Sequence, residues 1–402
     1  MSKKILFLSS TYPFGDGENF IAPEIDTLSS SLVLYVIPTY PRGNIKIDFP
    51  KNENIQYLDL SLLDKKYILP TAKLLIKKPM SFLRLIKRCR SDNVMRFCRN
   101  AILIPKAIFL NEFIQEKGID FLYSHWLTAP TQLALLINAI NGISYGVTGH
   151  RWDVVDANNF ELKFEYAKFV RLISNKSIEL LPPDISSKYK DKIHTVHMGV
   201  NIDPRKCPIT KSNDKNKNFK VLCIANLLPV KGHVYLIDAM KILHDKGLNV
   251  YLDLIGDGNL KQDLTEQIKA LELTNYVKLL GVFSHSELLN KLRTGEYELY
   301  CQPSIDLGDG HHEGIPVSLM EAMGHKVACI STYTGSIPEL IENLESGILV
   351  EDKSSSELAI AIERLYTDES LRTLIASNGY LKILKYFNQE LNNEKIRALI
   401  NA

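Results

Sequence analysis

The chain has 402 residues, 45% of them apolar, and a formal net charge of +2 at pH 7. This length predicts two or three domains of about 150 residues each, and so small a charge argues against a protein held on nucleic acid by overall charge. Six cysteines form no C-x-x-C pair, and no apolar stretch reaches the ~18 residues of a membrane span, so we expect a cytoplasmic protein with reduced cysteines. The short apolar run at 5–8, after a basic start, predicts a buried strand rather than a signal peptide.

Apolar runs typical of strands alternate with helical patterns along the first half of the chain. Strands are expected near residues 5–9, 32–38, 121–124 and 145–148, and a helix from about Phe20 to Leu28. A turn containing Gly15 and Gly17 follows the first strand. The alternation predicts an α/β fold with parallel sheets built from βαβ units.

The second half repeats strand and helix after a polar run at 211–218. Asn, Lys, Ser and Asp in that run cannot bury enough surface to pack, so it predicts a domain boundary before the strand near 220–225. We therefore predict domains at 1–210 and 211–378. The final segment, 379–402, is expected to be helical, with Tyr380, Leu384, Phe387 and Leu391 on one side.

The most informative segment lies between Glu313 and Glu321. Pro316 suits the first helical position, and Gly314 lets a ligand come close to the backbone. A helix beginning near Pro316 presents free N–H groups and the positive end of its dipole, which suit a diphosphate. Glu321 lies on the order of 7 Å deeper, at about 1.5 Å per residue, so the two carboxylates can hold opposite ends of a nucleotide sugar. Taken in isolation, such a pair of glutamates is more typical of one solvated acid before a helix and another within it.

This segment resembles the E-x7-E signature of retaining glycosyltransferases of the GT4 type. The family resemblance implies a GT-B fold, with two Rossmann-like doubly wound parallel-sheet domains, a donor site in the cleft between them and a last helix that crosses back to the first domain. Further stretches resemble the family in order and spacing, namely residues 226–233, 254–258, 281–283, 335–339 and 347–350.

The resemblance implies transfer of a sugar, with retention, from a UDP- or GDP-sugar to a carbohydrate or glycolipid acceptor, in cell-surface polysaccharide or glycoconjugate synthesis. It implies no required cofactor or metal. Glu313 would orient the sugar and His150 would support the sugar or the leaving diphosphate as the catalytic residues, although a lone histidine after a strand is also typical of a structural hydrogen bond. The implied donor-binding residues are Gly15, Gly17, Asn226, Lys231, Val282, Gly314, Ile315, Pro316, Val317 and Glu321.

Acceptor contacts are expected from Glu18, Asn19, Arg151 and Asp153, in the loops that follow the strands of the first domain. For the turn at Gly15, the alternative is a mobile loop without a ligand.

One residue departs from the family pattern, and one group of residues looks like a metal site. Asn226 stands where the family has an arginine, and an amide cannot replace the charged two-point contact of a guanidinium with phosphate. Asp306 and Asp309, followed by His311 and His312, look like metal ligands. We interpret them as a donor-side loop that leads into Glu313.

The segment 65–106 is strongly basic, with Asp92 as its one acid. Its interspersed apolar residues predict a basic amphipathic helix, which suits either an anionic membrane surface beside a lipid-linked acceptor or an ordinary solvated helical face. RNA binding is a lesser interpretation, because no aromatic stacking motif accompanies the charge.

Two other functions suit the same architecture. One is a nucleotide-sugar epimerase, which needs acid and base groups around the sugar. The other is a catalytically silent nucleotide-binding scaffold, which the departure at Asn226 favours.

Overall fold

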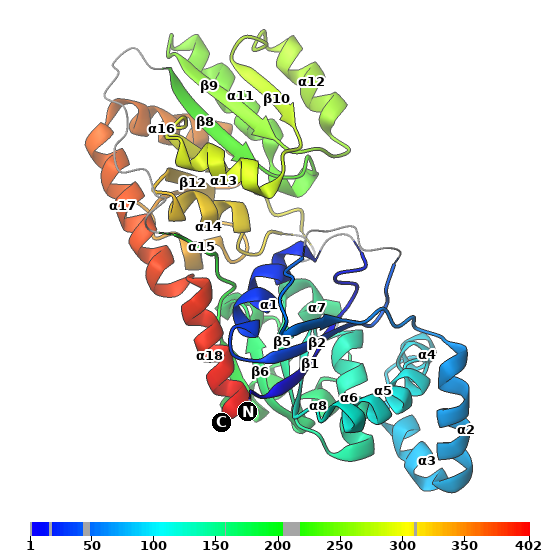
Figure 1. Cartoon of the computed structure of the whole chain (residues 1–402). Coiled ribbons are helices and arrows are strands. Elements are labelled where there is room, and N and C mark those ends of the chain that lie inside the picture. The colour runs from blue at the N-terminus through cyan, green and yellow to red at the C-terminus, as the bar shows by residue number, and fades with distance from the viewer. Residues whose placement is uncertain (1, 16–17, 43–48, 157, 204–217, 309–311) are drawn as a thin grey trace. The chain divides into compact units, whose positions relative to one another are not determined.

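A computed structural model describes residues 2–15, 18–42, 49–156, 158–203, 218–308 and 312–402 (Figure 1). The chain forms two compact units. Unit 1 comprises Met1–Met198 together with Gln389–Ala402, and unit 2 comprises Gly199–Asn388.

Unit 1 is built on a parallel sheet that has seven strands within the described residues, in the order β3-β2-β1-β4-β5-β6-β7. The apolar runs of the sequence supply these strands because both faces of a parallel sheet are covered by helices. Chain order reverses between β1 and β4, which makes a topological switch point at their carboxyl ends. The strands are β1 Lys4–Ser9, β2 Val33–Pro38, β3 Ile55–Tyr57, β4 Phe121–His125, β5 Tyr145–Gly149, β6 Ala167–Leu172 and β7 Ile193–Thr195.

Helices cover this sheet and extend beyond it at one side. Two of them, α5 and α6, carry proline in the first turn and end at a left-handed glycine, Gly118 with φ 62° and Gly142 with φ 77°. The helices of unit 1 are η1 Asn19–Ile21, α1 Ala22–Ser29, η2 Lys65–Tyr67, α2 Ile68–Lys77, α3 Pro79–Arg88, α4 Val94–Ala101, α5 Ile104–Lys117, α6 Ala129–Asn141, α7 Arg151–Asp156, α8 Phe160–Tyr166, α9 Asn175–Glu179, α10 Pro183–Lys188, η3 Lys190–Lys192 and α18 Gln389–Asn401.

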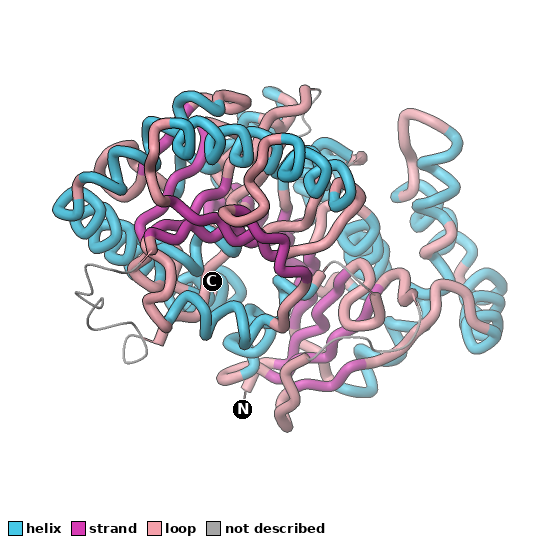
Figure 2. The backbone as a smooth tube through the Cα atoms, turned by 90° about the horizontal axis from the view of Figure 1, so that it is seen from above, coloured by secondary structure: helices cyan, strands magenta, loops and turns pink. Residues whose placement is uncertain are grey.

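Unit 2 repeats the plan with a parallel sheet of six strands in the described part of the chain, in the order β10-β9-β8-β11-β12-β13. Figure 2 shows the strands of both units between helices. The switch point of this unit lies between β8 and β11. Its elements are β8 Phe219–Ile224, η5 Pro229–Lys231, α11 His233–Asp245, β9 Val250–Ile255, α12 Lys261–Ala270, β10 Val277–Gly281, α13 His285–Arg293, β11 Leu299–Gln302, α14 Val317–Gly324, β12 Ala328–Thr332, α15 Ile337–Leu340, β13 Ile348–Val350, α16 Ser355–Thr367 and α17 Glu369–Tyr386.

The α/β class and the doubly wound sheets are confirmed, whereas the unit boundaries differ from the expected ones. The expected boundary at 210/211 lies outside the described residues. Residue 379 lies inside α17, and the break comes after Tyr386. Gly379 is a packing residue instead of a helix start, because a Cβ there would lie 2.9 Å from the carbonyl oxygen of Ser346.

The final helix, α18, completes unit 1. It packs beside α1, as Figure 1 shows, and its Ile396 and Ile400 are buried in the same cluster as Ile5 and Phe7 of β1. The amide Nδ2 of Asn393 donates to the carbonyl oxygen of Glu24 at 3.1 Å.

The sequence predicted one amphipathic helix for the basic segment 65–106. The structure instead divides this segment into η2, α2, α3, α4 and the first turn of α5. Pro79 begins α3, and Asn93 caps α4 by accepting from the N–H of Arg96 at 2.8 Å. Each therefore starts a new helix. Across the described residues, no helix combines the length and apolar character needed to cross a membrane.

Candidate active site

Two loops of unit 2 meet at its switch point. One follows β8 and carries Asn226 to Lys231, and the other runs from β11 to α14 and carries Glu313. Gly232 allows their close packing, since its φ is 67° and a Cβ there would lie 1.9 Å from the carbonyl oxygen of Pro303. In open α/β sheets, ligands bind at such crevices outside the carboxyl ends of the strands.

Lys231 and Glu313 form an ion pair across these loops, through Nζ and Oε2, and both side chains are mostly buried. The backbone of Glu313 is held from the other side by Gly335, which has φ 55° and would place a Cβ 1.8 Å from the Glu313 carbonyl oxygen. A cation and a carboxylate are thus brought to one place by residues 82 positions apart.

The start of α14 leaves backbone donors free. Pro316 is the N-cap with ψ 128° and not the first helical residue, so the helix begins one residue later than expected. Met320 donates to the carbonyl oxygen of Pro316 at 3.2 Å, while the N–H groups of Val317, Ser318 and Leu319 have no partner among the described residues. A Cβ at Gly314 would meet nothing within 4 Å.

Glu321, the fifth residue of α14, pairs with His285 at the start of α13. Its Oε1 lies 2.6 Å from His285 Nε2, and the side chain of His285 is 64% exposed whereas that of Glu321 is 11% exposed. The hydrogen bond to Glu321 raises the pKa of His285 above its usual value. Ser284 and Glu287 form a capping box that fixes the start of α13.

In unit 1, loops after β1, β4 and β5 meet at the carboxyl edge of the sheet. Glu18 fastens the first loop to the second: its carboxylate accepts from the backbone N–H of Thr11 at 2.7 Å and of Tyr12 at 2.6 Å, and from the indole N–H of Trp126. Asp153 fastens the second loop to the third, since its two oxygens accept the backbone N–H groups of Leu127 and His150. Burial raises the pKa of Asp153 to about 8.

His150 is 6% exposed and is enclosed by aromatic rings. The ring centroids of Trp126 and Phe20 lie 4.4 Å and 5.3 Å from its own. Its Nε2 lies 2.6 Å from Nε2 of His125, the last residue of β4. Burial lowers the pKa of His150 well below its usual value, so the ring is neutral at pH 7.

Residues 208–382 match the family described as "Glycosyl transferases group 1". This part of the chain is therefore similar to the glycosyl transferases group 1 family. It contains every element that builds the site in unit 2, from the loop after β8 to α14.

Named relatives match different lengths of the chain. The amylovoran biosynthesis glycosyltransferase AmsK of Erwinia amylovora is 30% identical over 210 residues, 52% of this chain and 51% of the relative, so the chain spans about half the length of AmsK. A UDP-Gal:alpha-D-GlcNAc-diphosphoundecaprenol alpha-1,3-galactosyltransferase of Escherichia coli is 23% identical over 333 residues, 77% of this chain and 83% of the relative.

The fold is that of GT-B glycosyltransferases. The solved structure of Anabaena HepE in complex with UDP superposes with a TM-score of 0.71 and 19% identity, and covers 99% of each chain.

Unit 2 brings Lys231, Glu313, Gly314 and the start of α14 together, whereas other residues that were predicted to bind the donor lie elsewhere. Val282 follows β10, which β9 separates from β8, and is 73% exposed. Asn226 is exposed, and its side-chain amide makes no hydrogen bond with the described residues. Ile315 lies between Gly314 and Pro316 in the same loop.

Several predicted residues of unit 1 have structural contacts of their own. A Cβ at Gly15 would lie 2.7 Å from Cβ of Thr11, which explains a glycine there. Asn19 begins η1, and the Arg151 guanidinium lies 4.9 Å from the centroid of the Trp152 ring. Gly17 lies outside the described residues.

The metal-like pattern before Glu313 is only partly described, because Asp309 and His311 fall outside the described residues. Within those residues, no group of three potential ligands gathers. Oδ1 of Asp306 accepts the N–H of Gly308 at 2.7 Å, and Nδ1 of His312 lies 3.0 Å from the Glu313 carbonyl oxygen.

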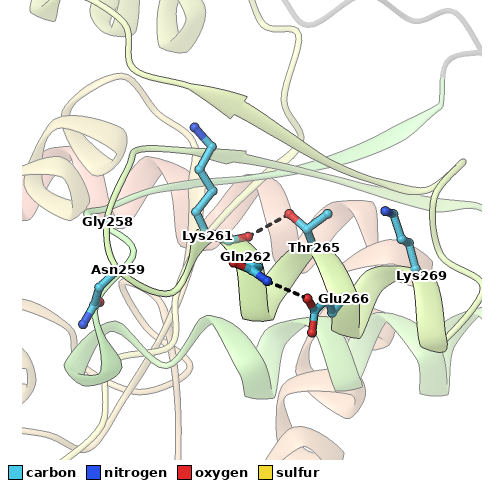
Figure 3. A pocket seen from close by; sticks show the side chains of 7 residues that line it. All are labelled: Gly258, Asn259, Lys261, Gln262, Thr265, Glu266 and Lys269. Atoms are coloured by element: carbon cyan, nitrogen blue, oxygen red, sulfur yellow. Dashed lines mark hydrogen bonds between the residues drawn. The ribbon is translucent and has the colours of Figure 1, made fainter.

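The sequence analysis did not predict His125, which contacts His150, or His285, which contacts Glu321. Both carried a signal: His125 directly follows the predicted strand 121–124, and His285 follows Ser284 in the pattern of a capping box. The open pocket in Figure 3 lies along α12 and contains none of the predicted site residues. Two of its lining residues, Gln262 and Thr265, make hydrogen bonds to other residues of α12.

Proposed function

We propose that the protein is a retaining glycosyltransferase that moves a sugar from a nucleotide-diphosphate sugar to a carbohydrate or lipid-linked acceptor in polysaccharide or glycoconjugate synthesis. The observation that carries this proposal is the Lys231–Glu313 pair beside the free N–H groups of α14, at the switch point of a glycosyl transferases group 1 domain. The named relatives are transferases, which gives no support to an epimerase or a silent scaffold.

The chemistry required of the donor site is stabilisation of a departing diphosphate. Preorganised donors lower the energy of the charge that develops on the leaving oxygen. The N–H groups of Val317 and Ser318 and the ammonium of Lys231 supply such donors. Phosphate would compete with Glu313 for Lys231, and the released carboxylate of Glu313 would then orient sugar hydroxyls.

Glu321 is assigned to the ribose of the nucleotide. The side chain of its partner His285 is exposed to solvent, so ribose hydroxyls can replace the Glu321–His285 hydrogen bond without opening the core.

We favour a uridine nucleotide over guanosine, because HepE binds UDP and the Escherichia coli relative uses UDP-Gal. No cofactor or metal is assigned.

The donor site is tested by thermal unfolding of the protein with saturating UDP, GDP, UDP-glucose and GDP-mannose. A ligand bound only by the folded state raises the unfolding temperature, by about 2.7 kcal/mol of stability at 100 times Kd. We expect a selective shift with the uridine ligands, and its loss in Glu321→Ala. Glu266→Ala, an exposed glutamate in the pocket of Figure 3, is the matched control and should keep the shift.

The reaction itself is tested with the nucleotide sugar that binds. Lys231→Ala and Glu313→Gln should each lower turnover by about 10²-fold or more, as loss of one charged or hydrogen-bonding group at a transition state does. The anomeric configuration of the product decides retention. Unchanged kinetics in both variants, or an inverted product, would contradict the assignment.

The acceptor is proposed to be lipid-linked and presented at the cytoplasmic face of a membrane. A relative that spans most of the chain acts on a diphosphoundecaprenol-linked sugar.

We define the α2–α4 surface as residues 68–101, which contain nine basic residues and one acid. No residue of α2 is buried, and large apolar side chains face solvent along it, among them Leu69 (77%), Ile76 (79%) and, at the start of α3, Met80 (72%).

Such a surface suits an anionic bilayer, because apolar side chains enter the interface while lysine and arginine meet the lipid charge. Sedimentation with vesicles that contain phosphatidylglycerol tests it. The triple variant Leu69→Ser, Ile76→Ser and Met80→Ser should weaken binding about 10-fold. Leu374→Ser with Leu381→Ser, exposed on α17, is the control. Equal binding of both variants, or equal binding to neutral phosphatidylcholine vesicles, would refute the membrane contact.

A further inference from the structure

Two neutral histidines share a hydrogen bond at the carboxyl edge of the unit 1 sheet. His125 ends β4, His150 follows β5, and their Nε2 atoms lie 2.6 Å apart. Burial lowers the pKa of each well below its usual value. A neutral imidazole has one N–H and one lone pair, so one ring donates from Nε2 and the other accepts there. The two possible arrangements differ in which nitrogen of His150 carries its proton.

Glu24 on α1 distinguishes the two arrangements. Its Oε1 lies 3.6 Å from Nδ1 of His125, and that nitrogen is buried without a hydrogen bond to any described residue. Its Oε2 accepts from Nη1 of Arg171 at 2.6 Å, so Glu24 presents an acceptor carboxylate. A lone pair on His125 Nδ1 would repel that carboxylate, whereas an N–H is attracted to it. The proton of His125 is therefore favoured on Nδ1.

With its proton on Nδ1, His125 accepts at Nε2, and His150 must donate from its own Nε2. The lone pair of His150 then lies on Nδ1, which makes no hydrogen bond with the described residues. We propose that Glu24 and His125 are positioning residues that hold His150 in the Nε2–H tautomer and thereby present its Nδ1 as a hydrogen-bond acceptor to a substrate hydroxyl.

This inference rests on the proposed function for the identity of the substrate. It decides whether His150 contacts the sugar or the leaving diphosphate. An imidazole nitrogen with a lone pair accepts from a sugar hydroxyl, but it cannot donate to a phosphate oxygen. His150 is therefore assigned to the sugar rather than to the leaving diphosphate. The aromatic rings of Phe20 and Trp126 restrict the orientation in which that nitrogen is offered.

The tautomers can be measured without any reaction, by ¹⁵N NMR of the ligand-free protein labelled at histidine. His125→Phe and His150→Phe assign the signals by their loss. We expect Nδ1 of His150 to resonate as an unprotonated nitrogen and its Nε2 as a protonated one, unchanged between pH 6 and pH 8. A protonated Nδ1 on His150 would overturn the inference even if the protein proves to be an active transferase.

Activity separates positioning from a purely structural role. His125→Phe keeps the ring that stacks on Phe7, with centroids 5.7 Å apart, but removes the acceptor nitrogen, whereas His125→Gln keeps an acceptor oxygen. We expect kcat/KM to fall about 10-fold in the Phe variant, as for one lost hydrogen bond, and to recover largely in the Gln variant. His194→Phe on β7 is the control.

Equal losses in His125→Phe and His125→Gln would overturn the positioning role. Absence of transfer in the wild-type protein would contradict the proposed function, while the NMR result would still decide the tautomer.

Discussion

The contact between Glu321 and His285 couples the nucleotide site to pH. Below the raised pKa of His285, its imidazolium holds the carboxylate that we assign to the ribose. Nucleotide binding must displace this partner and lower the pKa of His285, so a proton is released on binding. By linkage, affinity then rises with pH through the range in which His285 titrates.

We predict that nucleotide affinity increases about 3- to 10-fold from pH 6 to pH 8, as follows from release of up to one proton, and that His285→Ala loses most of this dependence. Isothermal titration in two buffers of different ionisation enthalpy measures both the affinity and the released proton. His244→Ala, at the far end of α11, is the control. The same pH dependence in His285→Ala would contradict the coupling.

At the level of residues, the sequence predicted the groups that occur within one local segment. Glu313, Gly314, Pro316 and Glu321 follow from the spacing of a loop that enters a helix. His285 did not, because its contact with Glu321 joins residues 36 positions apart and depends on how α13 packs beside α14. Roles assigned from spacing alone, such as ribose binding by Glu321, stay predictions.

Among the elements, α5 is attached to the sheet by a buried lysine that bonds to backbone carbonyl groups. Nζ of Lys106 donates to the carbonyl oxygens of Pro38, Thr39 and Leu60 at 2.7, 3.1 and 2.6 Å. Three acceptors match the three donors of an ammonium, whereas burial lowers the pKa of Lys106 to about 7. In the unfolded chain, lysine has a pKa near 10.4.

The sign of the pH effect follows from these two values. Between pH 7 and pH 10 the unfolded chain binds a proton at this lysine that the folded chain does not, so stability rises with pH, by up to about 1.4 kcal/mol per unit. We predict that the difference in unfolding free energy between wild type and Lys106→Met changes by about 2 kcal/mol from pH 7.5 to pH 9.5 in urea titrations. Lys73→Met, exposed on α2, controls for lost charge. A constant difference would mean that the carbonyl groups keep the amine protonated.

At the level of elements, most of the long apolar strands were predictable, whereas β6 and the short strands β3 and β7 were not. Strands β1, β2, β4, β5 and β8 lie within one residue of where the sequence predicted them, because each consists mostly of buried residues. Strands β3 and β7 have three residues each and no apolar pattern of their own.

For the whole molecule, the division into two units is discontinuous along the chain. The last described residues return to unit 1, where Ile396 and Ile400 of α18 fill space beside β1. The two tryptophans, Trp126 and Trp152, both lie in unit 1, so tryptophan fluorescence reports the unfolding of that unit alone.

We predict that Ile396→Ala lowers the unfolding free energy measured by fluorescence by about 2–5 kcal/mol, as for other large-to-small changes in a core. Leu391→Ala, exposed on the same helix, should change it by less than about 0.5 kcal/mol. Equal stability of the two variants would mean that α18 contributes no core to unit 1.

The position of α18 also bears on the order in which the protein matures during synthesis. Domains usually fold as they emerge, starting with the N-terminal one. Here the nascent N-terminal unit lacks Ile396 and Ile400 until residues 199–388 have been translated, so the apolar residues of their cluster, among them Ile5 and Phe7, lack that contact until then. Unit 2, which is continuous in sequence, can be complete on the ribosome first, so the unit translated first is the last to be finished.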